Sequence, residues 1–160
     1  MNDVVSPLAK PKLGAHGARA AVRLSDEYFL RALRIIADLN NGDIITAIVY
    51  RAVVAGNIGY LDEHAAEAAL YADVETVPPD HLRRPVSILS VAGALGLPYE
   101  TARRHVRKLI ALGHCRMERT GVIAPAERLV GPAEEAAMLA NLANLRRLFR
   151  RLKQAGVQLE

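Results

Sequence analysis

Residues 86–124, VSILSVAGALGLPYETARRHVRKLIALGHCRMERTGVIA, decide the fold of this chain. The first apolar residues of this stretch recur near helical spacing: Leu89, Val91, Ala92 and Leu95. The spacing predicts a short helix over about 87–95. Gly96 is expected to end that helix, because glycine readily adopts the left-handed conformation that closes a helix. The stretch therefore opens with a two-turn helix and a tight turn.

A second helix, from about Tyr99 to Leu112, is predicted to have one apolar and one cationic side. Pro98 suits its beginning, because the fixed φ and missing N–H of proline are tolerated in a first turn. The apolar residues follow spacings of three and four: Ala102, Val106, Leu109, Ile110 and Leu112. The cations fall mostly away from them: Arg103, Arg104, Arg107 and Lys108. We therefore expect a helix that buries one side, exposes guanidinium groups on the other, and ends at Gly113.

A β-hairpin is predicted directly after the second helix. Two short extended runs, within residues 115–119 and 122–124, flank Thr120-Gly121, a dipeptide that favours a turn. Val86 is expected to lie in a brief strand before the first helix and to pair beside this hairpin.

Together these residues resemble bacterial winged helix-turn-helix transcriptional regulators of the MarR and GntR type. The residues that carry the resemblance are Ala92, Gly96, Leu97, Thr101, Ala102, His105, Val106, Leu109, Gly113 and Thr120-Gly121. Two positions depart from the family pattern: Ala102 stands where a β-branched residue is usual, and Pro98 where a serine cap is usual. The resemblance covers residues 86–124 of 160, and it does not indicate which DNA sequence would be read.

The resemblance implies a mainly α fold with a small hairpin wing (115–124), flanked by N-terminal helices and a long C-terminal helix. In that geometry the helix 99–112 enters the DNA major groove. The implied groove-facing residues are Tyr99, Glu100, Thr101, Arg103 and Arg104. Phosphate contacts are expected from Arg107 and Lys108, and contacts to the backbone or minor groove from Arg116 and Arg119, which flank the wing.

Charge is distributed unevenly along the chain, although the net charge is only +4. Residues 22–80 hold four Lys or Arg against ten Asp or Glu, a net charge of −6. Residues 81–119 hold eight against two, a net charge of +6. The cationic face of a single helix is most often only a solvated face. The sign change at the helix-turn-helix pattern nevertheless favours a patch that faces a polyanion.

Four segments are predicted in the chain: 1–22 as a flexible arm, 23–77 as an N-terminal helical segment for the core or dimerisation, 78–130 as the winged helix-turn-helix, and 131–160 as a C-terminal helix. The hydrophobic fraction of 51% is ample for a buried core, although the aromatic fraction is only 4%. Alanine and leucine dominate, which favours packed helices over sheets. The single cysteine, Cys115, allows no disulfide within the chain and suits a reducing cytoplasm.

The N-terminal segment is predicted to hold three helices. The first covers 25–40, with Ser25 or Asp26 as its cap and an inward stripe of Phe29, Leu33, Ile36 and Leu39. After Asn40-Asn41-Gly42, Asp43 caps an apolar helix over 44–55, which is too short to span a bilayer and is expected to be buried; a central strand is the alternative. Residues 56–59 end it, and Asp62 caps a small helix that reaches about Tyr71. Residues 73–85, with three prolines, form a linker.

The last helix is predicted from Pro132 to Gln154. Its apolar residues repeat at spacings of four and three: Met138, Leu142, Leu145, Phe149 and Leu152, widened by Leu139 and Leu148. This is a coiled-coil type of seam, although two heptads are fewer than a coiled coil usually has. The helix is expected to dimerise, alone or with residues 26–57. The alternative is that it packs on the N-terminal helices of its own chain.

No pattern in the sequence indicates an enzyme. The five histidines, His16, His64, His81, His105 and His114, do not have the spacing of metal ligands, and no cofactor is expected. Cys115 would be a redox sensor only if nearby arginine lowered its pKa. The sequence thus predicts a homodimeric, sequence-specific regulator that binds double-stranded DNA and no membrane. The alternatives are an adaptor that binds another protein through the same module, and a regulator that also responds to a small effector held among residues 26–71.

Overall fold

The computed structural model describes residues 17–157, which form a mainly helical fold with one small antiparallel sheet. The longer elements, in chain order, are α1 (Ala18–Asp38), α2 (Ile44–Ile58), α3 (Ala65–Leu70), α4 (Ile88–Leu95), α5 (Tyr99–Ala111), β1 (Arg116–Glu118), β2 (Gly121–Ile123) and α6 (Pro132–Gln154). Short 3-10 helices cover Gly59–Glu63, Asp80–Leu82 and Ala126–Arg128. The helical character predicted from composition is confirmed.

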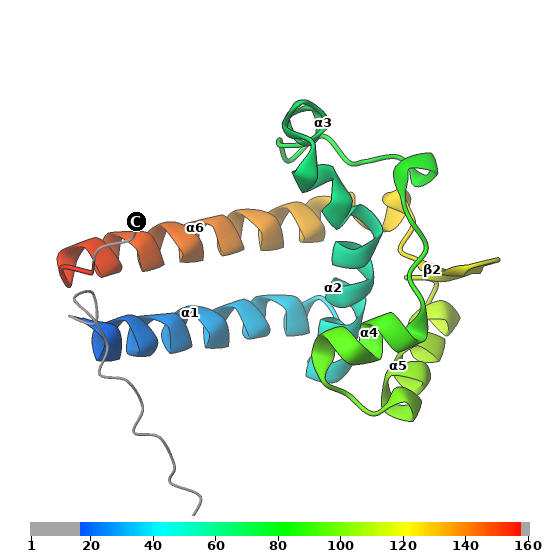
Figure 1. The fold of residues 1–160 in the computed structure, drawn as a ribbon, viewed down its shortest axis with the longest axis horizontal. Coiled ribbons are helices and arrows are strands. Elements are labelled where there is room, and N and C mark those ends of the chain that lie inside the picture. The colour runs from blue at the N-terminus through cyan, green and yellow to red at the C-terminus, as the bar shows by residue number, and fades with distance from the viewer. Residues whose placement is uncertain (1–16, 158–160) are drawn as a thin grey trace, which may run out of the picture.

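Helices α1 and α6 lie side by side and run antiparallel, as an arm that projects from a body made of α2, α4, α5 and the hairpin (Figure 1). The side chain of Asn144, which is buried, donates to the carbonyl of Tyr28 at 3.0 Å. Arg151 pairs with Glu27 along the same contact. The helix at the C-terminal end of the chain therefore packs on α1, as one of the two sequence interpretations proposes.

Helix α2 is the centre of the body. Seven of its residues are buried: Thr46, Ala47, Val49, Tyr50, Val53, Val54 and Asn57. They pack against apolar side chains of α4, α5 and the hairpin: Val91, Val106, Leu109 and Val122. The prediction of a buried helix is confirmed, and the alternative of a central strand is wrong.

Helix α2 continues beyond the point where the sequence pattern predicts its end. Gly56 and Asn57 are expected to break it, but both lie inside the helix. With the following turn, the stretch Ile44–Glu63 is long and apolar enough to cross a membrane by length and composition alone. Seven of the residues of α2 are buried within the protein itself, so α2 serves as the central helix of the body.

Asn57 explains why the helix continues. Its side chain has no exposed surface and donates to the carbonyls of Arg84 (2.8 Å) and Val122 (3.0 Å). Its Oδ1 accepts from the backbone N–H of Ala124 at 2.9 Å. The helix therefore gains three hydrogen bonds at this residue, two of them buried, and they tie α2 to the hairpin and to the segment before α4.

Two glycines allow the segment before α4, which contains Val86, to pass close to α2 and to β2. Val86 forms the predicted bridge with Val122, with backbone hydrogen bonds of 3.0 and 2.8 Å. A Cβ on Gly56 would lie 2.6 Å from Cγ1 of Val86, and a Cβ on Gly121 would lie 2.5 Å from the Val86 carbonyl oxygen. The sequence pattern places Gly121 in the hairpin turn, but it is the first residue of β2 and serves close packing instead.

Other predicted boundaries differ near the N-terminus. Helix α1 begins at Ala18 after Gly17, so neither Ser25 nor Asp26 caps it, and the last residues of the predicted arm (1–22) are helical. The remainder of that arm, residues 1–16, lies outside the described residues. Asp62 lies in a 3-10 turn, and α3 begins after His64 without a side-chain cap. Asp43, in contrast, caps α2 as predicted, by accepting from Thr46 N at 3.0 Å.

Several residues expected to face inward are exposed. Leu89 (69% exposed) and Leu112 (51%) lie on the outer sides of α4 and α5. Phe29, of the stripe predicted for α1, is 56% exposed. Helix α6 has the predicted bounds, but its seam is divided: Met138, Leu142 and Phe149 are exposed, whereas Leu145 is half-buried and Leu152 is buried. Asn144 and Leu148 lie beside residues of α1.

Candidate nucleic-acid interface

The α4–α5 pair is held at a fixed bend by its turn. Ser87 caps α4 by accepting from Ser90 N at 3.0 Å, and Gly96 ends the helix in the left-handed conformation, with φ 62°. Pro98 occupies the cap position of α5, so the helix begins one residue later at Tyr99. On the inner side of α5, Ala102, Val106 and Leu109 are fully buried against the body. The packing of these three residues fixes which side of α5 faces solvent.

Two rows of side chains follow the outer side of α5. One row has Glu100, Arg103 and Arg107, and the other has Thr101, Arg104 and Lys108; each has the i, i+3, i+7 spacing of neighbours on a helix. Glu100, Arg104, Arg107 and Lys108 are exposed, whereas Thr101 and Arg103 are half-buried. Tyr99 is exposed at the beginning of the helix. All seven predicted residues of α5 thus lie on or beside one surface, which we call the α5 surface.

The cations of the α5 surface differ in their partners. Arg103 donates from Nε and Nη2 to one oxygen of Glu100, at 2.8 and 2.6 Å, and Lys108 donates to Asp43 at 2.7 Å. Within residues 17–157, Arg104 and Arg107 have no ion-pair partner. These two guanidinium groups are therefore the cations of α5 that no carboxylate of the described chain neutralises.

Asp43 joins α2 to α5 through a small polar cluster. Its carboxylate accepts from Lys108, from the Thr46 backbone and from the Thr46 hydroxyl (2.7 Å), and these bonds hold its pKa well below the usual value. Because the single hydroxyl proton of Thr46 goes to Asp43, Nδ1 of His105 must donate to Thr46 Oγ1, 2.8 Å away. Burial lowers the pKa of His105, so the neutral ring is favoured. The cluster fixes α5 against the beginning of α2.

The cations of the hairpin are placed differently. Arg116 is bonded to Glu118 (2.8 Å) and to Asp80 (2.9 Å), and these carboxylates raise its pKa. Arg119 lies in the exposed two-residue turn with Thr120. Of the two predicted wing residues, Arg119 is therefore the one at the tip, and Arg116 is held near the base.

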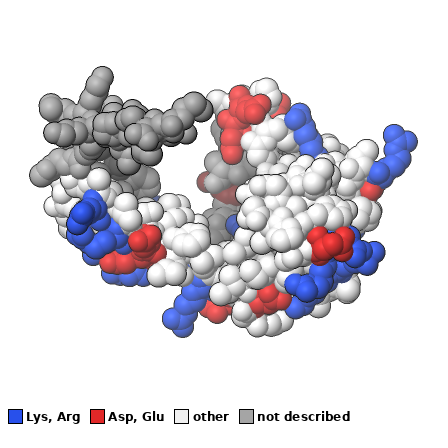
Figure 2. Space-filling model, turned by 60° about the horizontal axis from the view of Figure 1, so that its bottom comes forward, with Lys and Arg blue, Asp and Glu red and all other residues white. Residues whose placement is uncertain are grey.

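Only some of the cations in residues 81–119 contribute to a positively charged surface. Arg83 is buried, with its Nη2 donating to the Pro78 carbonyl at 2.9 Å, so it does not contribute to an external patch. Lys108 and Arg116 are paired with acidic residues from the first half of the chain. Figure 2, with the α4–α5 end turned forward, shows Lys and Arg side chains gathered at the lower right with carboxylates among them.

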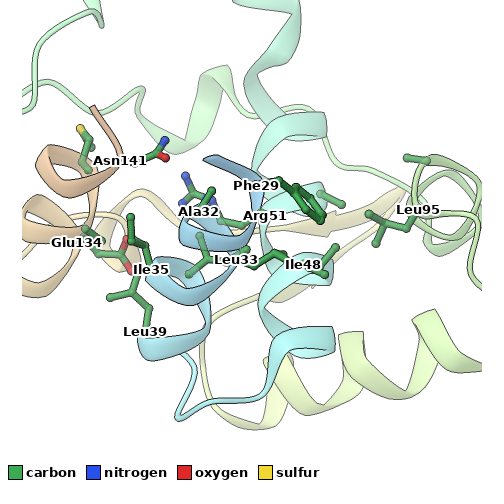
Figure 3. Close-up of a pocket in the computed structure, with 15 residues that line it drawn as sticks. Phe29, Ala32, Leu33, Ile35, Leu39, Ile48, Arg51, Leu95, Glu134 and Asn141 are labelled. Carbon is green, nitrogen blue, oxygen red and sulfur yellow. The ribbon is translucent and has the colours of Figure 1, made fainter. Parts of the chain in front are cut away.

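A pocket lies where the arm meets the body (Figure 3). This pocket of about 550 Å³ is lined by Phe29 and Leu33 of α1, Ile48 of α2 and Leu95 of α4, together with residues of α6. Its polar residues are Arg51, Glu134 and Asn141. The sequence indicates apolar stripes on α1 and α6, but it carries no signal that they border an open pocket, which depends on the angle between arm and body.

Other candidate sites are weaker. Burial raises the pKa of Cys115 to about 12, so the lowered pKa that a redox-sensing thiol needs is contradicted. In the part of the chain from 17 to 157, no three His, Cys, Asp or Glu side chains converge as metal ligands.

No protein-family model, no curated protein and no solved structure matches the chain. The assignment of a function therefore depends on the geometry and charge of the α5 surface and the hairpin.

Proposed function

We propose that the chain is a winged helix-turn-helix protein that binds double-stranded DNA sequence-specifically and regulates transcription in the cytoplasm as a homodimer. The order of its elements supports this proposal: a short helix, a glycine turn, a cationic helix and a hairpin follow one another along the chain. In such an arrangement the second helix is the one that enters the major groove.

The observation that carries the proposal is the α5 surface. The residues that hold α5 to the body are apolar and fully buried, so its polar side is left outward with Arg104 and Arg107 exposed and unpaired within the described chain. Arginine at exposed helix positions binds phosphates and reads guanine through paired hydrogen bonds. Arg119, exposed in the hairpin turn, adds a further cation to the winged module.

The arm supports the homodimer. Its two helices expose an unusual set of large apolar side chains: Val22, Phe29, Leu30, Met138, Leu139, Leu142 and Phe149. Exposed apolar surface of this extent marks an interaction site in a soluble protein. The seam of α6 has the repeat of a coiled coil, and three of its five residues, Met138, Leu142 and Phe149, are exposed in the single chain, so a second copy of the chain is the occupant that its pattern fits. A two-fold pair would present two α5 helices to two half-sites.

The test is binding of the full chain to a library of randomised DNA duplexes, followed by affinity measurements on the recovered sites at several salt concentrations. The wild-type protein should bind with an affinity that falls steeply as salt rises, because phosphate contacts release counterions. Arg104→Ala/Arg107→Ala should weaken binding and flatten the slope of log affinity against log salt by about 2, since each phosphate contact contributes ~0.9.

The matched control is Arg146→Ala/Arg150→Ala, which removes two exposed cations from α6 and should leave the salt slope unchanged. Wild-type protein that retains no duplex at low salt would overturn the proposal. The adaptor interpretation would then be favoured, with the carboxylates paired to Arg103, Lys108 and Arg116 as its supporting observation.

A further inference from the structure

One edge of a guanidinium group on the α5 surface is already occupied. Arg103 donates from Nε and Nη2 to the same Glu100 oxygen, Oε2, at 2.8 and 2.6 Å. The guanidinium is planar and presents two donor edges: a side edge with Nε and one Nη, and an end edge with both Nη groups. Glu100 takes the side edge, so the end edge remains available for another acceptor pair.

The ion pair also restricts how Arg103 moves. Glu100 and Arg103 lie one turn apart on the same row, and the side chain of Arg103 is only 33% exposed. The paired carboxylate lowers the pKa of Glu100 and raises that of Arg103, so both groups stay charged. A long, flexible side chain is thereby held in one direction before any DNA contact is made, which reduces the entropy lost on binding.

The end edge of arginine matches one base in particular. Guanine presents two neighbouring acceptors, O6 and N7, in the major groove, and the commonest specific contact there is a two-bond pair with arginine. Adenine has an amino group in place of O6, so only one of the two bonds can form with it. A guanidinium held by its side edge therefore distinguishes guanine from the other three bases.

We propose that Arg103 reads a guanine in the major groove and that Glu100 is the positioning residue that makes this reading selective. The inference rests on the proposed DNA-binding function and specifies the base that this part of α5 recognises. Glu100 itself contributes no favourable contact to phosphates, and as an anion on the DNA-facing side it lowers affinity for every duplex.

This proposal predicts two opposite effects of Glu100→Gln on full-length protein. Affinity for DNA of unrelated sequence should rise, because a negative charge beside the phosphates is removed. The preference for guanine over the other bases at one position of the selected site should fall about tenfold, which is within the range for a single paired contact. Arg103→Lys should lose the same preference at the same position, since lysine lacks the planar fork.

Glu135→Gln, an exposed glutamate in the first turn of α6, is the matched control and should change neither quantity. A thermal melt of each variant separates this role from a merely structural one, because stabilisation of the helix by Glu100 would alter the melting temperature and leave the base preference intact. Wild-type protein that selects a site whose guanine preference is unaffected by Glu100→Gln and Arg103→Lys would overturn this inference while leaving the proposed function standing. Wild-type protein that binds no duplex would overturn both.

Discussion

Asn57 shows how one polar side chain can organise a hydrophobic core. Its three hydrogen bonds satisfy an N–H and two carbonyls that come from beyond α2. Asn57→Ala should lower the free energy of unfolding by about 2–3 kcal/mol, because the Ala124 N–H would be left buried without a partner. Denaturant titration measures this loss. Gln154→Ala, at an exposed position near the end of α6, is the control, and an equal effect of both changes would contradict the role given to Asn57.

His105 should make the free energy of unfolding depend on pH, over a higher pH range than the one in which the carboxylates act. Burial lowers its pKa in the folded chain from the ordinary 6.5, against the opposing effect of Asp43, with Arg104 and Lys108 lowering it further. The unfolded chain therefore binds more protons near pH 6, and stability falls as the pH drops below about 6.5.

Unfolding measured by denaturant between pH 7 and 5 should thus be less pH-dependent in His105→Gln than in the wild-type protein. The lowered pKa of Asp43 acts at lower pH: its stabilisation is lost only as the pH falls below its ordinary 3.8, so this loss should persist in the variant. His64→Gln, at an exposed position, is the control. A wild-type curve that is flat from pH 7 to 5 would contradict the prediction.

At the scale of elements, two glycines with opposite surroundings give a paired test. Gly93 lies in α4, and a Cβ added there would meet nothing within 4 Å, so Gly93→Ala should raise the free energy of unfolding by about 0.5–1 kcal/mol through helix propensity. Gly121→Ala should lower it by about 1–3 kcal/mol, because the added methyl group would meet the Val86 backbone at 2.5 Å. Denaturant titration of both variants under identical conditions checks the signs, and a loss at Gly93 would contradict the account of α4.

Elements that are bounded by glycine or proline could be predicted from the sequence. Pro132 and the run of apolar spacings placed α6 correctly, and the turns at Gly96 and Gly113 placed the ends of α4 and α5. The end of α2 could not be predicted, because glycine and asparagine usually end a helix and the sequence has both at Gly56-Asn57. What keeps them helical is the contact with Val86 and the bonds to Arg84, Val122 and Ala124, all distant in the sequence.

The residues of the candidate site could be predicted from the sequence, but the ion pairs and hydrogen bonds that they form could not. Helical spacing placed Arg103, Arg104 and Arg107 away from the apolar stripe, as the structure has them. The pairing of Lys108 with Asp43 joins residues 65 positions apart, and no local pattern indicates it. The burial of Arg83 likewise depends on how the loop before α4 folds back on the body.

At the scale of the whole molecule, the apolar arm predicts a concentration-dependent oligomer. Phe149→Glu should convert a homodimer into a monomer in sedimentation experiments, because a charge would be placed in the apolar seam (57% exposed in the single chain). Wild-type melting temperature should also rise with protein concentration. Leu70→Glu is the control, since Leu70 is also exposed (67%) and belongs to α3, which is not part of the α1–α6 arm (Figure 1). A wild-type protein that sediments as a monomer at all concentrations would contradict the prediction.

The three partners of Asn57 lie 27, 65 and 67 residues further along the chain. On a ribosome that adds roughly 5–20 residues per second, the last of them is made ~3–13 s after Asn57 itself. For most of that interval the nascent α2 lacks the Val122 and Ala124 partners of Asn57 and the hairpin that covers its apolar side. Growth of the polypeptide thus leaves the core incomplete until the hairpin has been translated, and early truncation would release an aggregation-prone fragment.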